Sequence, residues 1–203
     1  RNNQMEPLWG TEIFPEYYSR FEKAARETEG VTLTWEGHFI DPLFTHTTAG
    51  FTRPGDEEHP YLASVSCVHD PEEEGFVQEM IMQPEEAAKR VSAIPAGDGS
   101  FRTIPPEAFP EQVQIISRDE AGYALQLQIG GFPFNGEEVR LALGLPSACF
   151  ELDRHGSDVR FTVRGRGHGW GLSQTEAQAL AEDGWSAEAI LEYFYTGISF
   201  SSE

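Results

Sequence analysis

The stretch GRGHGWGLSQTE holds the residue types in this chain that are best suited to chemistry. Arg166, His168 and Trp170 alternate with glycines, and Ser173 and Gln174 follow directly. An imidazole and a guanidinium can hydrogen-bond sugar hydroxyls or carboxylates, and an indole ring can stack on the face of a pyranose. This combination is typical of a carbohydrate site. A phosphate site is disfavoured because neither the dinucleotide-binding glycine pattern nor the ending of a P-loop is present.

The element that should carry these side chains is a strand. The segment DVRFTVRG alternates apolar and polar residues and leads straight into the glycines. If that strand continues, the four glycines lie on one face, and Arg166, His168 and Trp170 lie on the other. Bare backbone on the glycine face would let a ligand or another part of the chain approach closely. Tight strand packing for the glycines and a buried, hydrogen-bonded His168 are the structural alternatives.

A helix should follow the glycines. The residues Ser173-Gln-Thr-Glu176 fit the S-x-x-E capping box, which predicts a helix over 174–182 that ends at Gly184. Ser173 is then an N-cap, and this structural role stands beside a functional one. A second helix, capped by Ser186, is expected to turn Ile190, Leu191 and Phe194 towards a core; these residues have the spacing of one helix face.

The rest of the chain mixes short helices and strands without a regular βαβ rhythm. This predicts an α+β fold with a mixed or antiparallel sheet and interspersed short helices, in which a glycine-rich strand leads into a C-terminal helix pair. Asn135 and Gly144 bracket one predicted helix as N-cap and C-terminal glycine. The other expected elements are a helix over 16–29, strands on both sides of a Glu36-Gly37 turn, a helix over 83–94, strands over 113–117 and 123–129, and a hairpin around His155-Gly156.

The overall charge excludes several classes of partner. The chain has 203 residues, with 14 Lys and Arg against 34 Asp and Glu, for a net charge of −20. Nucleic-acid binding and attraction to an anionic membrane surface both need clustered basic residues, which are scarce here. No apolar run is long enough to span a bilayer. The chain starts at Arg1 without a Met, which predicts a processed or trimmed product. Cys67 and Cys149 could form one disulfide or remain two free thiols.

The segment GRGHGWGLSQTEAQALAEDGWSAEAILEYFYTG resembles the C-terminal signature of the stage II sporulation protein D / amidase-enhancer (SpoIID/LytB) family. The pattern G-H-G-x-G-Φ-S-Q begins at Gly167, and Trp170 occupies its variable place. Upstream, AARETEGVTLTWEGHFIDPLFTHTTAGFT, PYLASVSC and NGEEVRLALGLPSACF also look like family segments. The resemblance extends over roughly 8–197 and implies one such domain over 1–203, incomplete at its N-terminus.

The resemblance implies a lytic transglycosylase that acts on peptidoglycan strands stripped of their stem peptides. The partners would be these glycan strands and other cell-wall hydrolases. The location would be extracytoplasmic, at the cell wall, with any anchor in a segment before Arg1. The implied substrate-binding residues are His46, Arg166, His168, Trp170, Ser173 and Gln174. Of these, His168, Ser173 and Gln174 would support catalysis.

Such a reaction needs a general acid, usually a Glu whose pKa is raised by burial. In the family this Glu precedes an Ala-Ala-Arg-Thr stretch, and neither is found here. The earliest acids, Glu6 and Glu12, have no matching surroundings. The alternative function is therefore a non-catalytic module that binds peptidoglycan or modulates an amidase.

The segment THTTAGFT departs from the family's His-x-x-Ser-Gly pattern, because Ala49 stands where Ser is usual and Phe51 where a second Gly is usual. Some relatives hold zinc through Cys and His near this segment, which leaves a zinc hydrolase as a third class. The available donors are His46, His59, Cys67 and His69, and their spacing fits no standard zinc pattern. We therefore predict no metal site and no cofactor.

Overall fold

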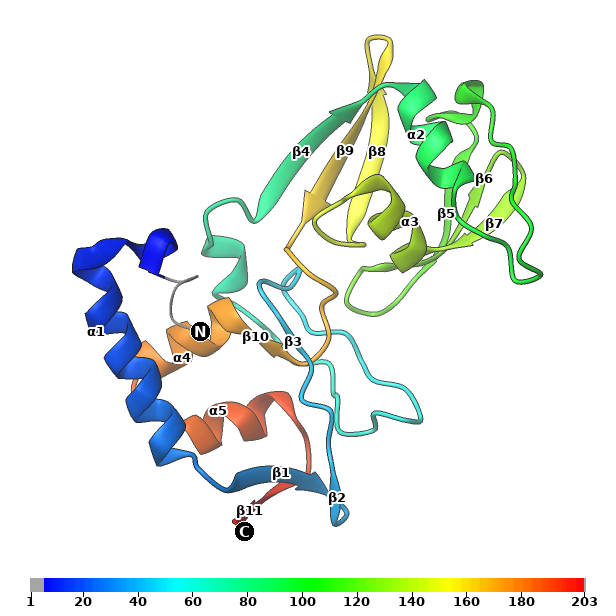
Figure 1. Ribbon diagram of the computed structural model, residues 1–203. Helices are drawn as coiled ribbons and strands as arrows, with labels where there is room; N and C mark the ends of the chain where they lie inside the picture. Colours follow the sequence, from blue (N-terminus) through cyan, green and yellow to red (C-terminus); the bar gives the residue numbers. More distant parts are fainter. Residues whose placement is uncertain (1–5, 203) are drawn as a thin grey trace. The chain divides into compact units, whose positions relative to one another are not determined.

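The computed structural model describes residues 6–202, with side chains described from Phe14 to Ser201. These residues form two compact units. Figure 1 labels the helices and strands of each unit. The predicted α+β class is confirmed: small, mostly antiparallel sheets alternate with short helices. The assignment of a single domain over 1–203 stays a prediction. No helix within 6–202 has the length and apolar character that crossing a membrane would require.

The first unit combines the N-terminal helix with one small three-stranded sheet, whose strands come from both the N-terminal and the C-terminal part of the chain. Its elements are α1 (Glu6–Glu27), β1 (Val31–Trp35), β2 (His38–Phe39) and β11 (Ile198–Ser202). β1 pairs with both β2 and β11, antiparallel. The predicted turn at Glu36-Gly37 is confirmed, and both residues have positive φ, 49° and 82°. α1 begins before the predicted helix and contains Pro15. The side chains of Glu6 and Glu12 lie outside the described residues.

The second unit, Asp41–Gly197, holds the main core. Its helices are α2 (Pro84–Ser92), α3 (Gly136–Leu143), α4 (Gln174–Glu182) and α5 (Ala187–Phe194), with short 3₁₀ turns η2 (Asp70–Glu72) and η3 (Pro106–Ala108). Its strands are β3 (Phe44–Thr45), β4 (Val77–Met82), β5 (Val113–Arg118), β6 (Ala124–Ile129), β7 (Phe132–Asn135), β8 (Phe150–His155), β9 (Asp158–Arg164) and β10 (Leu172–Ser173).

Two antiparallel sheets, β4-β9-β8 and β5-β6-β7, share one apolar core with α2 and α3. β9 supplies it through strict alternation, since Val159, Phe161 and Val163 are buried while their neighbours are not. The helix ends agree with the sequence. Asn135 caps α3 by accepting a hydrogen bond from the backbone of the second helical residue, and Gly144 ends it in the left-handed conformation.

The prediction that a strand runs through the glycines is wrong. β9 ends at Arg164, and Gly165, Gly167, Gly169 and Gly171 all have positive φ, between 71° and 112°. A chain that takes a left-handed turn at every second residue cannot be extended, so Arg166, His168 and Trp170 do not share a strand face. The stretch is an irregular loop, which we call the glycine loop (residues 165–171).

The glycine loop lies directly against the segment that contains β3. A Cβ atom at Gly171 would be 1.8 Å from the carbonyl oxygen of Leu43, and one at Gly167 would be 2.1 Å from Oγ1 of Thr45. At Gly169 it would meet the ring of Tyr123 at 2.4 Å. The alternating glycines are thus explained by backbone conformation together with close packing.

We expect Gly169→Val to destabilise the second unit by about 3 kcal/mol or more, because it adds a left-handed β-branched residue and a collision with the ring of Tyr123. Thermal and urea unfolding measure the loss. Gly97→Val is the matched control, because a Cβ at Gly97 has nothing within 4 Å and its φ is not in the left-handed range. Wild-type stability in Gly169→Val would contradict this account of the loop.

Candidate functional site

The candidate site is built where the glycine loop meets β3 and the start of α4. β3 and β10 pair in parallel, with Phe44 opposite Leu172 and Thr45 opposite Ser173. The backbone pairing continues beyond the strands, since the amide of Thr175 donates to the carbonyl of His46 over 3.1 Å. The chain therefore delivers the first turn of α4 to the side of the β3 segment.

A buried carboxyl group lies beneath this junction. Asp70 is fully buried and accepts hydrogen bonds from the backbone amide and the hydroxyl of Thr48, both at 2.6 Å. The hydroxyl of Ser173 donates to the same carboxyl group over 2.8 Å. Burial raises the pKa of Asp70, while the hydrogen bonds from Thr48 and Ser173 act to lower it. One side chain thus holds the β3 segment, η2 and the start of α4.

The predicted N-cap of α4, Ser173, is confirmed. The side chain of Glu176, however, bonds His69 and not the backbone of Ser173 as a capping box would have it. The Ser173 hydroxyl accepts from the amide of Glu176 at 3.4 Å. The carboxyl group of Glu176 accepts a hydrogen bond from the backbone amide of His69 at 2.8 Å. It also lies 3.1 Å from the ring nitrogen Nδ1 of His69. This contact raises the pKa of His69, helped by the charges of Asp183 and Glu72. Ser173 itself is fully buried, so its hydroxyl faces Asp70 and not the surface.

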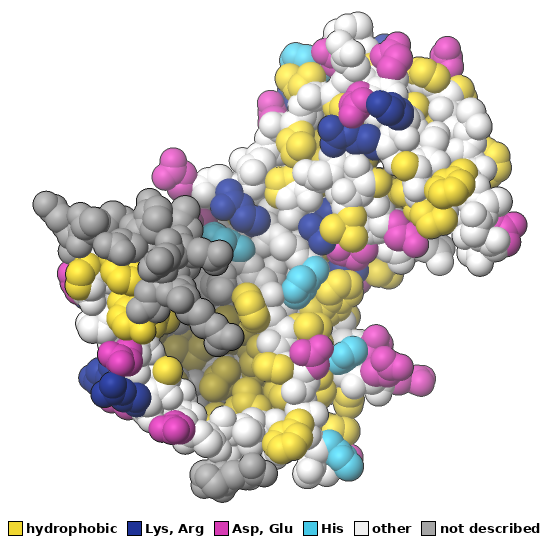
Figure 2. Space-filling model, viewed as in Figure 1, with side chains coloured by type: hydrophobic (Ala, Val, Ile, Leu, Met, Phe, Trp, Pro, Cys, Tyr) yellow, Lys and Arg dark blue, Asp and Glu magenta, His cyan; other side chains and the backbone are white. Residues whose placement is uncertain are grey.

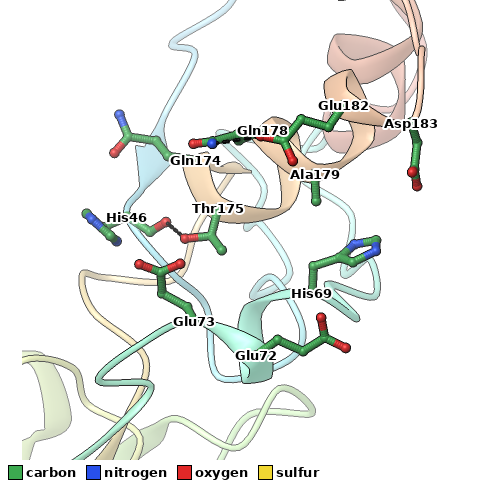
Figure 3. A pocket seen from close by; sticks show the side chains of 10 residues that line it. All are labelled: His46, His69, Glu72, Glu73, Gln174, Thr175, Gln178, Ala179, Glu182 and Asp183. Carbon is green, nitrogen blue, oxygen red and sulfur yellow. Dashed lines mark hydrogen bonds between the residues drawn. The ribbon is translucent and has the colours of Figure 1, made fainter.

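A cavity of about 630 Å³ opens between α4 and the η2 segment. Figure 3 shows α4 on one side, with His69 and the two glutamates of the η2 segment on the other. The residues that line it are His46, His69, Glu72, Glu73, Gln174, Thr175, Gln178, Ala179, Glu182 and Asp183. We call this cavity the α4 pocket. Its lining includes four acids and two histidines and neither Lys nor Arg, so its field is negative.

The structure brings two of the predicted site residues together in this pocket. His46 and Gln174 are both exposed and both line it, and they follow β3 and β10 directly. The ring nitrogen Nδ1 of His46 lies 2.7 Å from the hydroxyl of Thr47, which in turn contacts the hydroxyl of Thr175 at 2.9 Å. These contacts orient the imidazole at the pocket mouth. Arg166 is exposed, and its backbone pairs with Thr47.

His168 and Trp170 stack on each other away from the lining of the α4 pocket. Their ring centroids are 5.7 Å apart, and Nδ1 of His168 accepts the backbone amide of Trp170 at 3.0 Å. Burial lowers the pKa of His168, which favours the neutral imidazole that this hydrogen bond requires.

The indole of Trp170 is held on a second side by Arg53. The guanidinium carbon of Arg53 lies 3.8 Å from the centre of the indole, and the indole N–H donates to the carbonyl of Pro54 at 3.1 Å. Arg53 is itself buried and paired with Asp119 at 2.6 Å and Glu137 at 2.8 Å. Trp170 also lines a separate cavity of about 180 Å³. The rings of His168 and Trp170 thus pack mainly against each other and against Arg53.

Sequence reasoning missed the groups that hold the site together. Asp70 and Arg53 lie in the irregular stretch after β3, where no periodicity or motif marks them. Their partners are far away in sequence, and no local signal indicates such pairs. The acids that line the α4 pocket come from two stretches. In the sequence, one has the character of a solvated loop and the other that of the outer face of a helix. Both cysteines are free and buried, which decides the alternatives left open for them.

Within the described residues, no three or more His, Cys, Asp or Glu side chains are grouped so that they could hold a metal ion. Burial raises the pKa of the Cys67 thiol to about 12, helped by the charge of Asp70, which disfavours the thiolate that a metal would bind. The absence of a zinc site stays a prediction.

The fold and the site define an α+β protein in which the capped helix α4 and the η2 segment border an acidic pocket. No family model matches the chain. It is 28% identical to stage II sporulation protein D of Bacillus amyloliquefaciens and of Bacillus subtilis, in each case over 98% of this chain. It is 22% identical to the amidase enhancer of Bacillus subtilis over 91% of this chain. The chain is therefore a distant homologue of these proteins.

The alignments cover 56% and 55% of the two sporulation proteins and 33% of the amidase enhancer. The chain thus spans about half the length of the sporulation proteins it matches. The homology agrees with the resemblance carried by the glycine motif.

The contact between His69 and Glu176 should make stability depend on pH. Because the pKa of His69 is raised above its ordinary value of about 6.5, its stabilisation is complete below that pH and is lost as pH rises through the higher folded value. We expect the melting temperature of the wild type to fall over this range and that of His69→Gln to fall less. Scanning calorimetry between about pH 5.5 and 8.5 measures both.

His155→Gln is the control, because His155 is exposed at the end of β8. It should keep the pH profile of the wild type, which includes the repulsion among the many acids. An unchanged profile in His69→Gln would show that the pair does not contribute.

Proposed function

We propose that this chain is the glycan-binding part of a peptidoglycan lytic transglycosylase that acts on strands stripped of stem peptides. The observation that carries the proposal is the position of Gln174. The motif shared with the sporulation protein D family ends on this residue, which lines the α4 pocket together with His46; the two follow Ser173 and Thr45, which pair between β10 and β3. An amide and an imidazole that line the same pocket offer both donors and acceptors to sugar hydroxyls and acetamido groups.

The remaining motif residues act through the fold in this proposal. Ser173 caps α4 and bonds Asp70, while His168 and Trp170 stack within the glycine loop. They fix the position of Gln174 and so support catalysis without contacting the sugar ring at the pocket. Arg166 is exposed and remains available to a hydroxyl or carboxylate of a longer strand.

The general acid is proposed to lie in the part of the protein that corresponds to the unmatched half of the relatives. A carboxylic acid that protonates a glycosidic oxygen needs a raised pKa and access to substrate. Asp70 meets the first condition but not the second, because it is fully buried and surrounded by its own donors. The location proposed for the whole protein is outside the cytoplasmic membrane, at the cell wall.

A second candidate is a non-catalytic module that binds peptidoglycan or modulates an amidase. Two observations favour it: the similarity to a protein named amidase enhancer, and the inaccessibility of Asp70. In this alternative the α4 pocket still holds glycan, but no bond is cleaved. The two candidates share the binding prediction and differ in the catalytic one.

The negative field of the α4 pocket has a consequence for either candidate. Denuded strands carry the lactyl carboxylate of muramic acid, which the acids of the pocket repel. Binding must then come from hydrogen bonds and apolar contacts, and salt should strengthen it by screening the repulsion. Figure 2 agrees with this, since acidic side chains are spread over the visible face and basic ones are few.

We expect Gln174→Ala and His46→Ala each to weaken the binding of soluble denuded glycan strands by about two- to tenfold, as the loss of one or two hydrogen bonds implies. Titration calorimetry with the 203-residue chain measures the dissociation constants at low and moderate salt. Gln114→Ala, an exposed glutamine on β5, is the matched control. Equal affinities for all variants would overturn the proposed site.

We expect the 203-residue chain alone to release anhydro-sugars from denuded strands about 10²- to 10⁴-fold more slowly than the complete protein, because a general acid is missing. Chromatography of the reaction products measures both rates. Equal rates for the two forms, abolished by His168→Ala, would place the acid in this chain. Binding without cleavage by the complete protein would favour the non-catalytic module.

A further inference from the structure

The strand β3 and the residue after it, His46, have one exposed face, and His46 on that face lines the α4 pocket. Thr45 and Thr47 are buried, whereas Phe44 and His46 are exposed, so the two exposed side chains point to the same side of the strand. Residues two apart on a strand are separated by about 6.6 Å, roughly the length of one sugar ring. Phe44 therefore lies two residues before His46, whose imidazole lines the α4 pocket.

Phe44 is an exposed apolar ring on a paired strand. It is 60% exposed, although it lies within a paired strand and opposite the half-buried Leu172. A polar residue at this position would leave the buried face of β3 unchanged. The exposed ring therefore contributes little to the core, and its exposure leaves a flat apolar surface beside hydrogen-bonding groups.

Trp170 is less suited to the same task. Its ring lies against the guanidinium of Arg53 and the imidazole of His168, and its N–H is bonded to a backbone carbonyl. A sugar could stack on that ring only by displacing the imidazole of His168 or the buried, doubly paired Arg53. The ring of Phe44 is accessible without such a rearrangement.

We propose that Phe44 is the stacking platform for a sugar ring adjacent to the one bound at His46 and Gln174. This inference rests on the proposed function, because it adds a neighbouring contact to the same pocket. The apolar face of a pyranose, lined by C–H groups, loses water when it packs on the phenyl ring. Such a contact is neutral, so the acids of the α4 pocket do not oppose it. It makes Phe44 a binding and positioning residue that selects carbohydrate over acidic peptide.

The test is the affinity of the 203-residue chain for soluble denuded glycan strands, measured by titration calorimetry. We expect Phe44→Ala to weaken binding about two- to tenfold and Phe44→Trp to retain or strengthen it. Phe101→Ala is the matched control, because Phe101 is 69% exposed and its backbone pairs with Pro95, beyond α2, and not with the β3 segment. Melting temperatures should equal that of the wild type, since the ring of Phe44 is outside the core.

The outcomes separate this inference from the proposed function. If Gln174→Ala weakens binding and Phe44→Ala does not, the stacking platform is wrong and the pocket stands. If the wild type does not bind glycan at all, both are wrong. If Trp170→Ala weakens binding while it leaves the melting temperature unchanged, and Phe44→Ala has no effect, stacking belongs to the indole and the assignment to Phe44 is overturned.

Discussion

The site depends on the hydrogen bonds that the carboxyl group of Asp70 accepts. This carboxyl group is buried and accepts hydrogen bonds from Thr48 and Ser173, so it ties the β3 segment to the start of α4. Because burial raises its pKa despite these bonds, desolvation of the carboxyl group costs free energy that the rest of the fold must offset. The gain is geometric. One anchor fixes two walls of the α4 pocket, and α4 cannot shift along β3 without leaving the Ser173 hydroxyl or the Thr48 donors unpaired.

The glycine loop follows from the same anchor. With β10 held beside β3, the seven residues that lead into it must turn repeatedly within the space left by Leu43, Thr45 and Tyr123. Side chains at Gly167, Gly169 and Gly171 would occupy that space, and L-residues would resist the positive φ values. Alternation of glycine with larger residues is therefore what a tightly packed loop with periodic left-handed turns requires. It resembles strand periodicity only in its spacing of two.

Local signals in the sequence were sufficient for the helices and hairpins. Caps at Asn135, Ser173 and Ser186 all formed as predicted, because a side chain that bonds an amide two or three residues away needs no distant partner. The sequence pattern of the glycine loop wrongly suggests a strand because its actual conformation is set by contacts with distant parts of the chain, such as Leu43, Thr45 and Tyr123. Asp70 was missed for the same reason: its bond to Ser173 spans 103 positions.

Residue type and residue availability are separate questions, and the aromatic residues show the difference. The motif indicates that a ring near Gln174 could meet a sugar, and Trp170 is the ring it contains. In the fold, however, Arg53 must neutralise Asp119 and Glu137 while buried, and the indole supplies the surface against which its guanidinium packs. That electrostatic requirement uses the ring of Trp170. Phe44 carries no such obligation, because its strand partner leaves it exposed. In the proposed function, Phe44 is the neutral contact for a glycan whose own negative charge is opposed by the acids that line the α4 pocket.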